Sequence, residues 1–482
     1  MGVLKAKPVL SRCKHVALAT LLMVQGASLA LAQALPPELA SVWNASRLPQ
    51  SSLSIVVDEA DGPRLIGVNP QEPRNPASVM KLVSTWAGLS ALGPEYTWRT
   101  TLMAQDGLQV DEQGTLKGPL YIKAGGDPFL TVPQLWDMLR ELRLRGVKNL
   151  TEVIVDRSIF GNVTINPGDF DNAGDRPYNA SPDAMMVGLG ASRLVFQPDT
   201  QARKWIAIID PPLPGVRVQG EVEWSTATCP GSPVVGTQIQ PEAGGMVVRV
   251  SGKAAASCGE FSVYRLVHSQ TEFFDKLFRS LWRDLGGTLA RDIKAGRVPA
   301  RAQAITWHDS QSLSDLIRLI NKQSNNVMAR TILLTVGAEM NGPGATVATG
   351  ERAVMNVLGR QGVNTAGWTV DNGSGLSRNA RVTAGGMADM LKVAWRSNWM
   401  PEYISSFAIS GVDGTVRSRL RDDEVQGRAH LKTGTLRDSR ALAGYVLGAS
   451  GKRYIVVMMV NDERSASARP LFDAVVKWLA VR

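Results

Sequence analysis

Strand-like segments at both ends of the chain constrain its fold more than any other feature. Near the start, residues 52–58 (SLSIVVD) and 64–69 (RLIGVN) flank an Asp-Gly-Pro turn and predict a β-hairpin. Near the end, three further strands are expected, at 429–436, 441–449 and 453–460. Since hairpins at the two ends of a chain can share one antiparallel sheet, we expect such a sheet, with helices on its faces. The amphipathic segment 468–481 is one of these helices.

The middle of the chain has a different pattern of expected strands and helices, which predicts insertions into this main domain. Strand, helix and strand patterns follow one another at 118–125, 131–146 and 150–156, as is typical of a small α/β unit. Residues 186–262 are rich in Gly, Pro, Thr and Val in short alternating runs, which favours a separate β-rich module. A helical pattern returns at 272–287. The simplest architecture is nested: the α/β insertion interrupts the main domain and itself carries the β-rich module.

The first 32 residues predict a cleavable export signal. A basic start is followed by an apolar run at 16–27, and Ala30-Leu31-Ala32 offers small residues for cleavage before Gln33. The alternative is an uncleaved membrane anchor, but Gln25 and Gly26 break the run. No later segment approaches the ~20 apolar residues that a spanning helix needs. We therefore expect an exported protein without a transmembrane segment.

Charge and cysteine usage narrow the classes of partner and cofactor. Removing residues 1–32 takes away four basic residues and no acidic one, so the net charge falls from +10 to +6. This excess suits an anionic surface or polymer, and no basic-aromatic module indicates nucleic acid binding. Cys229 and Cys258 remain, either as two free thiols or as one disulfide whose loop of about 30 residues is worth roughly 3 kcal/mol. Without a CxxC or clustered histidines, neither a metal site nor a cofactor is expected.

A lone lysine next to a serine marks the candidate nucleophile. In NPASVMKLVS (75–84), Ser78 and Lys81 lie three residues apart, and Lys81 is the only charged residue from 78 to 93. Three residues correspond to about one helical turn, so the two side chains can meet. Burial disfavours the charged form of a lysine, and a neutral amine beside a hydroxyl is a base beside a nucleophile. The alternative is that this Ser-x-x-Lys pattern arises by chance and that the lysine amine extends to solvent.

Two more motifs decide between these readings. Ser324-Asn325-Asn326 precedes an apolar helix, and Lys432-Thr433-Gly434-Thr435 lies on a strand near the end of the chain. Ser-x-x-Lys, Ser-x-Asn and Lys-Thr-Gly in this order resemble the motif set of penicillin-binding proteins and serine β-lactamases. The resemblance predicts a β-lactamase/transpeptidase-like domain within an α+β multidomain fold.

Each motif residue has an expected task. Ser324 relays a proton between Lys81 and the leaving group, and the Asn326 amide holds a substrate carbonyl. Lys432 adds positive charge suited to a terminal carboxylate. Thr433 and Gly434 belong to the strand beside which substrate is expected to bind, and Gly434 allows close approach. The backbone N–H groups of Ser78 and Thr435 are expected to form an oxyanion hole.

The spacing of the motifs points to one branch of this superfamily. Ser78 and Ser324 are 246 positions apart, a separation that resembles the class C low-molecular-mass penicillin-binding proteins, the D-alanyl-D-alanine carboxypeptidase/endopeptidase family. The segments 123–130 (KAGGDPFL), 155–160 (VDRSIF) and 372–378 (NGSGLSR) are also similar to that family, although Asn372 stands where Asp is often found. The resemblance implies a disulfide between Cys229 and Cys258 in the smaller insertion.

What the resemblance implies is acyl transfer on peptidoglycan stem peptides that end in D-Ala-D-Ala, with β-lactams as inhibitors. It implies a periplasmic location, peripheral association with the membrane or wall, and substrate contacts from Asp156 and Arg378. Structural roles for Asp156 and Arg378 remain open alternatives. The expected domains are a signal peptide (1–32), a catalytic domain (33–97 and 303–482), an inserted α/β domain (98–185 and 263–302) and an inner β-rich domain (186–262).

Two other functions compete with a peptidase. A β-lactamase or esterase on the same scaffold would need an extra base for rapid deacylation, and no obvious glutamate follows Ser78. A non-enzymatic wall-binding protein would be expected to have lost a catalytic residue, yet all three motifs are intact. Both readings are weaker than the peptidase.

Overall fold

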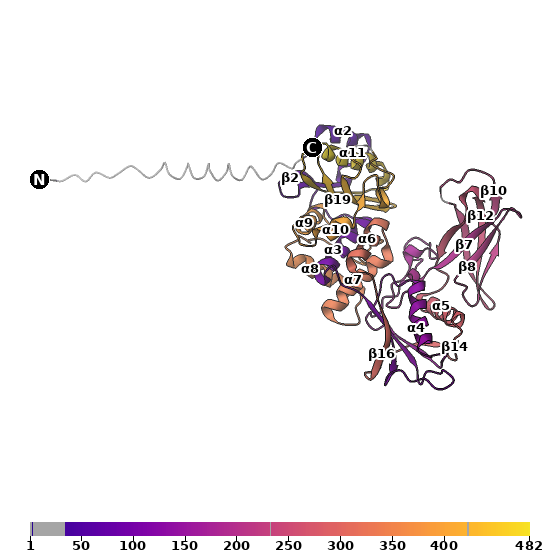
Figure 1. Cartoon of the computed structure of the whole chain (residues 1–482). Helices are drawn as coiled ribbons and strands as arrows, with labels where there is room; N and C mark the ends of the chain where they lie inside the picture. Colours follow the sequence, from indigo (N-terminus) through magenta and orange to yellow (C-terminus); the bar gives the residue numbers. More distant parts are fainter. Residues whose placement is uncertain (1, 3–33, 232, 422–423) are drawn as a thin grey trace.

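The computed structural model describes residue 2 and residues 34–231, 233–421 and 424–482. The expected cleavage site and nearly all of the expected export signal lie outside these ranges. Figure 1 shows three lobes, with α2 and α11 at one end of the molecule and the strands β7 to β12 at the other. Within the described ranges, no helix is long and apolar enough to span a bilayer.

The first lobe contains the segments in which the catalytic domain was expected, and its sheet joins strands from near the two ends of the chain, as predicted. The strand order is β17-β18-β19-β20-β1-β2, and all neighbours are antiparallel. The bounds are β1 Leu53–Glu59, β2 Arg64–Val68, β17 Ala408–Ile409, β18 Ala429–Leu436, β19 Ser439–Leu447 and β20 Arg453–Asn461. The central strand β20 is buried on both faces, which explains its continuous apolar run.

Helices cover both faces of this sheet, and the alternation along β1 shows how. Ile55 and Val57 share one apolar cluster with α2 (Pro37–Ala45) and α11 (Arg469–Ala480), whereas Val56 belongs to the cluster on the other face. Since side chains alternate along a strand, consecutive residues serve two cores. The second face is covered by α3 Met80–Leu92, α6 Leu313–Gln323, α7 Asn326–Asn341, α8 Val347–Arg360, α9 Ala384–Trp395 and α10 Met400–Ser405.

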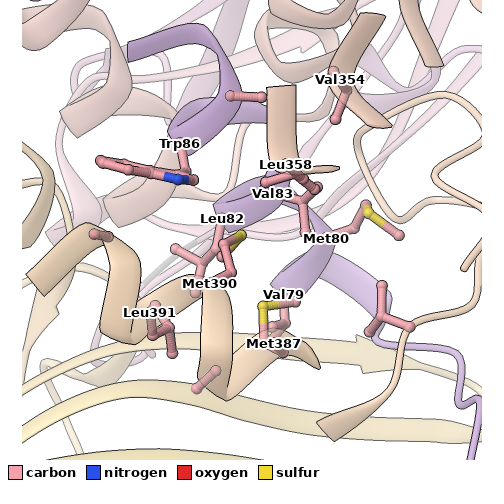
Figure 2. Close-up of a cluster of buried hydrophobic side chains, with 14 of the residues drawn as sticks. Val79, Met80, Leu82, Val83, Trp86, Val354, Leu358, Met387, Met390 and Leu391 are labelled. Atoms are coloured by element: carbon pink, nitrogen blue, oxygen red, sulfur yellow. The ribbon is translucent and has the colours of Figure 1, made fainter. Parts of the chain in front are cut away.

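Helix α3 lies in the centre of this second core. Every residue from Met80 to Leu89 is buried, which is why the sequence shows almost no polar face there. Figure 2 shows Leu82 and Trp86 of α3 among Leu358 of α8 and Met387 of α9. The residues just before and within α3 are thus held by packing from several helices at once.

The inserted α/β domain has a five-stranded sheet in the order β15-β6-β4-β3-β16. Its elements are β3 Arg99–Gln105, β4 Leu120–Lys123, α4 Val132–Leu144, β5 Asn149–Leu150, β6 Val153–Asp156, α5 Gln270–Asp284, β14 Thr288–Leu289, β15 Ile293–Ala295 and β16 Ala302–Asp309. The strand β16 crosses the expected domain boundary at 303, and it pairs with β3 along its length. The chain therefore returns to the catalytic domain after Asp309.

The inner β-rich domain is a small pair of sheets. One has the order β13-β7-β8, and the other is β10-β12-β11 with β9 beside β12. The bounds are β7 Ser192–Asp199, β8 Lys204–Asp210, β9 Val216–Gly220, β10 Glu223–Ser225, β11 Val235–Glu242, β12 Gly245–Ala255 and β13 Phe261–Arg265. Cys229 and Cys258 form a disulfide in this domain, as the resemblance implied.

Candidate active site

Ser78 lies in a strained turn that leads into α3. The helix begins at Met80, and Ser78 belongs to a 3₁₀ turn at Ala77–Val79, so it precedes the helix rather than lying within it. Ala77 has a φ of +46°, in the left-handed region that residues with a side chain rarely adopt. Such strain persists only where the surroundings hold it, and it is concentrated at functional sites.

Two glycines hold this turn from opposite sides. A Cβ atom on Gly375 would lie 1.8 Å from the carbonyl oxygen of Ala77, and one on Gly434 would lie 2.5 Å from that of Pro76. Neither distance is sterically tolerable. The loop 372–378 and the strand β18 can therefore approach the Ser78 turn only because both positions are glycine.

Lys81 is fully buried, and its Nζ atom has three oxygen neighbours. They are Ser78 Oγ at 3.0 Å, Asn326 Oδ1 at 2.6 Å and the carbonyl oxygen of Ser374 at 2.6 Å. The two carbonyl-type oxygens can only accept hydrogen bonds, so Lys81 must donate to both. A neutral amine has two N–H groups, which these two hydrogen bonds use, and one lone pair. The lone pair is then available to accept a proton from Ser78, whose hydroxyl is the third neighbour.

The surroundings favour this neutral amine. Burial is the main reason why the pKa of Lys81 lies well below its ordinary value, and the charges of Lys432 and Arg330 lower it further. Among the described residues, no carboxylate forms an ion pair with Lys81 to oppose these effects. The arrangement is that of a general base next to a nucleophile.

The second motif occupies the junction of two helices. Ser324 ends α6 with a φ of +59°, and Asn325 caps α7 by accepting a hydrogen bond from the Met328 N–H at 3.0 Å. This sharp junction places Asn326 against Lys81. The same junction places Ser324 next to Lys432 rather than Lys81. Lys432 Nζ donates a hydrogen bond to Ser324 Oγ at 2.8 Å.

Lys432 is buried as completely as Lys81. Its Nζ also donates to the Thr433 carbonyl oxygen at 3.0 Å, and burial lowers its pKa to about 7. Lys432 therefore lies behind the Ser324 hydroxyl and is not an exposed ammonium.

Asn326 connects the site to the inserted α/β domain. While its Oδ1 accepts from Lys81, its Nδ2 donates to the Tyr178 carbonyl oxygen at 3.2 Å. One turn later on α7, Arg330 donates to the Ala180 carbonyl oxygen at 3.0 Å. The segment around 178–180 thus forms one wall of the site.

The third motif lies on β18, directly beside the Ser78 turn. Thr433, Gly434 and Thr435 border a cavity of about 370 Å³ that is also lined by Arg419, Arg440 and Arg469. The Thr433 hydroxyl is hydrogen-bonded to that of Thr415 at 2.9 Å, whereas Thr435 is exposed. Positive charge next to this strand suits an anionic group on a bound molecule.

Asp156 and Arg378 lie apart from this centre. Asp156 ends β6 and lines a separate cavity of about 270 Å³ with Arg99 and Lys123. Its carboxylate accepts hydrogen bonds from the N–H groups of Ser158 at 3.0 Å and Val298 at 2.9 Å. Although burial alone would raise its pKa, these hydrogen bonds and the nearby Arg297 outweigh burial, so the pKa is lowered and the group is ionised at neutral pH.

Arg378 bridges the two domains. Its guanidinium lies 4.4 Å from the centre of the Phe170 ring in the inserted domain and 3.5 Å from Asp438 at the β18–β19 turn.

Sequence reasoning missed two contributors to the Lys81 environment. Ser374 acts through its backbone carbonyl, which no side-chain pattern reveals, although the Gly-Ser-Gly composition marked a tight loop. Arg330 carried the clearer signal: like Lys81, it is a lone charge within an apolar helical stretch, and it is 5% exposed.

Comparison with known proteins gives matches over nearly the whole chain. A family model described as the D-Ala-D-Ala carboxypeptidase 3 (S13) family matches residues 35–481. A D-alanyl-D-alanine carboxypeptidase from Actinomadura sp. (strain R39) is 28% identical over 443 residues, which cover 89% of this chain and 80% of that protein. The D-alanyl-D-alanine carboxypeptidase DacB of Haemophilus influenzae is 25% identical over 392 residues, 80% of each protein.

Solved structures share the fold. Penicillin binding protein 4 of H. influenzae superposes with a TM-score of 0.73 at 22% identity, over 92% of this chain and 99% of that one. The same protein has been solved with a β-lactam, and that structure gives a TM-score of 0.71 at 21% identity. A predatory endopeptidase from Bdellovibrio bacteriovorus gives 0.51 at 14% identity, over 88% and 92% of the two chains. The likeness confirms the expected α+β multidomain fold with its β-lactamase/transpeptidase-like domain.

Proposed function

Since the chain belongs to the D-Ala-D-Ala carboxypeptidase 3 (S13) family, we propose that it removes terminal D-alanine through an acyl-enzyme on Ser78, with Lys81 as the general base. The family confirms the resemblance to class C penicillin-binding proteins and makes the chain a serine-type D-alanyl-D-alanine carboxypeptidase. The observation that carries the proposed mechanism is the buried Lys81 Nζ, which lies 3.0 Å from Ser78 Oγ and has two closer neighbours that can only accept hydrogen bonds.

Acylation begins when the Ser78 hydroxyl gives its proton to Lys81. The Ser78 oxygen attacks the carbonyl carbon of the penultimate D-alanine, and the resulting oxyanion accepts hydrogen bonds from the backbone N–H groups of Ser78 and Thr435. As the C–N bond breaks, the leaving D-alanine amine takes a proton. Water then attacks the ester and gives a proton to Lys81. As the ester C–O bond breaks, Lys81 returns that proton to Ser78 Oγ, and the shortened peptide is released.

Ser324 is suited to pass the proton to the leaving amine. Its oxygen accepts from Lys432, so its own hydrogen is free to be donated. In this relay the Ser324 hydroxyl gives its proton to the leaving nitrogen and receives one from protonated Lys81. Asn326 would hold a substrate carbonyl through Nδ2 in place of the Tyr178 carbonyl oxygen.

The test of the function is covalent labelling beside product release. The mature protein is incubated with a fluorescent penicillin, the adduct is weighed on the intact chain, and its position is mapped by peptide digestion. Free D-alanine is measured separately from a soluble pentapeptide that ends in D-Ala-D-Ala. One stable adduct on Ser78 together with D-alanine release is expected. Rapid turnover of penicillin without D-alanine release would instead identify a β-lactamase, and neither activity would favour a wall-binding protein.

The charge on Lys432 predicts a pH dependence that differs between substrates. With a pKa of about 7, Lys432 is charged below neutral pH and loses its charge as the pH rises. If the charged form attracts the substrate carboxylate, the second-order acylation constant for benzylpenicillin should fall about tenfold between pH 7 and 8.5. A neutral ester should lack this alkaline fall, and so should penicillin with Lys432→Met. The same fall for the ester would assign the titration to another step.

Endopeptidase cleavage of crosslinked peptides would use the same machinery, with Asp156 and Arg378 as more distant substrate contacts. The ionised Asp156 borders a cavity that suits a cationic amino group, such as that of a diaminopimelate side chain. The segment that carries Tyr178 lies between the two domains, so a long peptide could extend from Ser78 toward Asp156. Export to the periplasm remains part of this proposal.

We expect Asp156→Asn to lower kcat/KM about tenfold for a stem peptide with a free diaminopimelate amine, because one charge-assisted hydrogen bond is lost. The same peptide with that amine acetylated is the control and should be cleaved equally by both proteins. Equal losses on both peptides would show that Asp156 acts only through its hydrogen bonds to Ser158 and Val298.

A further inference from the structure

The strand β18 has an open outer edge next to the Ser78 turn. Its outer neighbour β17 pairs with it only at 430–431, so within the described chain the edge at 432–436 has no strand partner. Gly434, in the middle of this edge, faces the Ser78 turn, since a Cβ atom there would lie 2.5 Å from the Pro76 carbonyl oxygen. A peptide that lies along such an edge can contact both faces of the strand.

The other face of this edge belongs to the side of the sheet that α11 covers. Thr433 and Thr435 alternate onto that face. Arg440 of β19 lies directly opposite Thr435 in the strand register, so the two side chains start on the same face. Leu442, which alternates with Arg440 along β19, packs in one cluster with the apolar residues of α11. The register therefore places Thr433, Thr435 and Arg440 together on the α11 side.

Two more arginines line the cavity of about 370 Å³ on this side. Arg419 donates a hydrogen bond to Asp473 of α11, and Arg469 Nε lies 3.7 Å from the other oxygen of the same carboxylate. Arg440 donates to two backbone carbonyl oxygens and has no carboxylate partner among the described residues. Arg419 Nε is buried without any partner in the part of the chain that the structure describes. Three guanidinium groups thus share one carboxylate, and one buried donor is unused.

This cavity is larger and more cationic than the release of D-alanine requires. D-alanine is a small molecule with a single carboxylate, which one guanidinium can hold as a bidentate pair. A volume of about 370 Å³ is in the range of sites for much larger ligands. Three guanidinium groups suit several carboxylates. The arrangement favours a longer leaving group that carries more than one of them.

The position of the cavity selects the half of the substrate that it would contact. In the proposed reaction the acyl half runs from Ser78 past Tyr178 toward the inserted domain. The leaving nitrogen lies at Ser324, whose hydroxyl accepts from Lys432 of β18, so the leaving group continues along β18. Figure 1 shows α11 at the end of the molecule away from the inserted domains. The two halves of a substrate therefore extend in opposite directions, and the leaving half meets the arginines.

We propose that this arginine cavity, lined by Arg419, Arg440 and Arg469, binds the leaving chain of a crosslinked stem peptide through its carboxylates. In such a crosslink the scissile amine belongs to a diaminopimelyl residue of a second stem, which carries further carboxylates on its D-glutamyl and terminal D-alanyl residues. The proposal rests on the proposed function, since cleavage still requires the Ser78 acyl-enzyme. It assigns preference for crosslinked peptides to the catalytic domain as well as to the inserted one.

The test compares two soluble substrates of the mature protein. One is a pentapeptide that ends in D-Ala-D-Ala, and the other is a dimer in which the D-alanine of one stem is bonded to the diaminopimelate amine of a second. The readout is the ratio of kcat/KM for the dimer to kcat/KM for the pentapeptide. Arg469→Met should lower this ratio about tenfold, because one charge-assisted hydrogen bond to the leaving chain is lost. Arg469→Lys keeps the charge and should lower it less.

Arg396→Met is the matched control. The Arg396 side chain is 62% exposed with a carboxylate 3.8 Å away, and that of Arg469 is 61% exposed with one at 3.7 Å, but Arg396 lies at the end of α9, on the other side of the sheet. The control should leave the ratio unchanged. An equal fall in Arg396→Met, or no fall in Arg469→Met, would overturn the proposal.

A second dimer separates recognition of charge from a change of shape. Its leaving chain carries amides in place of the D-glutamyl and terminal carboxylates. For this dimer the ratio should be the same in Arg469→Met and in the unaltered protein, whereas an equal fall for both dimers would contradict recognition of carboxylates. No D-alanine release from the pentapeptide by the unaltered protein would reject the proposed function and this inference with it. Release with no cleavage of the dimer would reject only the inference.

Discussion

Ser78→Ala should abolish covalent labelling by penicillin and lower D-alanine release by at least about 10⁴-fold, because no other group can form the acyl ester. The fold should persist. Ser78 contributes one hydrogen bond to Lys81, which keeps its two shorter ones to Asn326 and Ser374. The free energy of unfolding should therefore change by about 1 kcal/mol or less. Intact mass and a thermal melt measure the two effects on the same sample.

Ser90→Ala is the matched control. Ser90 lies near the far end of α3, where its hydroxyl accepts a hydrogen bond from Gln361. This variant should be labelled as fully as the unaltered chain. An adduct that persists in Ser78→Ala, and maps to another serine, would contradict the assignment of the nucleophile.

The catalytic sheet was predictable from the sequence because its signals are local and strong. The strands at 429–436 and 453–460 appear almost at the expected residues. The boundary near 303 was less visible: β16 has no distinctive turn at that point, and its membership is decided by pairing with β3, some 200 residues away. Pairing over such distances leaves little trace in local composition.

The motif residues were also predictable, but their partners were not. That Ser78, Lys81 and Asn326 meet follows from the motif order, since the fold brings the motifs together. The partner of Ser324 depends on its left-handed backbone conformation at the helix junction, which no periodicity indicates. Similarly, the Lys432 amine was expected to face the cleft, but the alternation of a strand does not tell how deeply a side chain is buried.

Lys81→Cys should lower the rate of acylation by about 10³-fold or more, because the base that takes the Ser78 proton is lost. The change also removes a buried donor from Asn326 Oδ1 and from the Ser374 carbonyl oxygen, each worth about 1–3 kcal/mol. A lower rate alone would thus not separate loss of a base from loosening of the site. To separate these two effects, a variant is needed whose side chain at position 81 has the shape of lysine but lacks the amine.

The chain allows this separation because the other cysteines of the described structure, Cys229 and Cys258, are bonded to each other. Alkylation of the new thiol with 2-bromoethylamine gives a lysine-like side chain, and alkylation with 1-bromopropane gives one of the same shape without nitrogen. Only the aminoethyl form should regain acylation, by about 100-fold or more over the propyl form.

The pH profile adds a second test of the base. Because the pKa of Lys81 lies well below its ordinary value, acylation should fall only as the pH drops through that lowered pKa and the amine becomes charged. The sulfur of the aminoethyl form makes its amine less basic, so its acid limb should move to lower pH. Equal rescue by the propyl form would show that Lys81 fills space, and an unmoved acid limb would assign that titration to another group. Rescue by the amine alone, with the limb displaced, is what a neutral lysine that accepts the Ser78 proton requires.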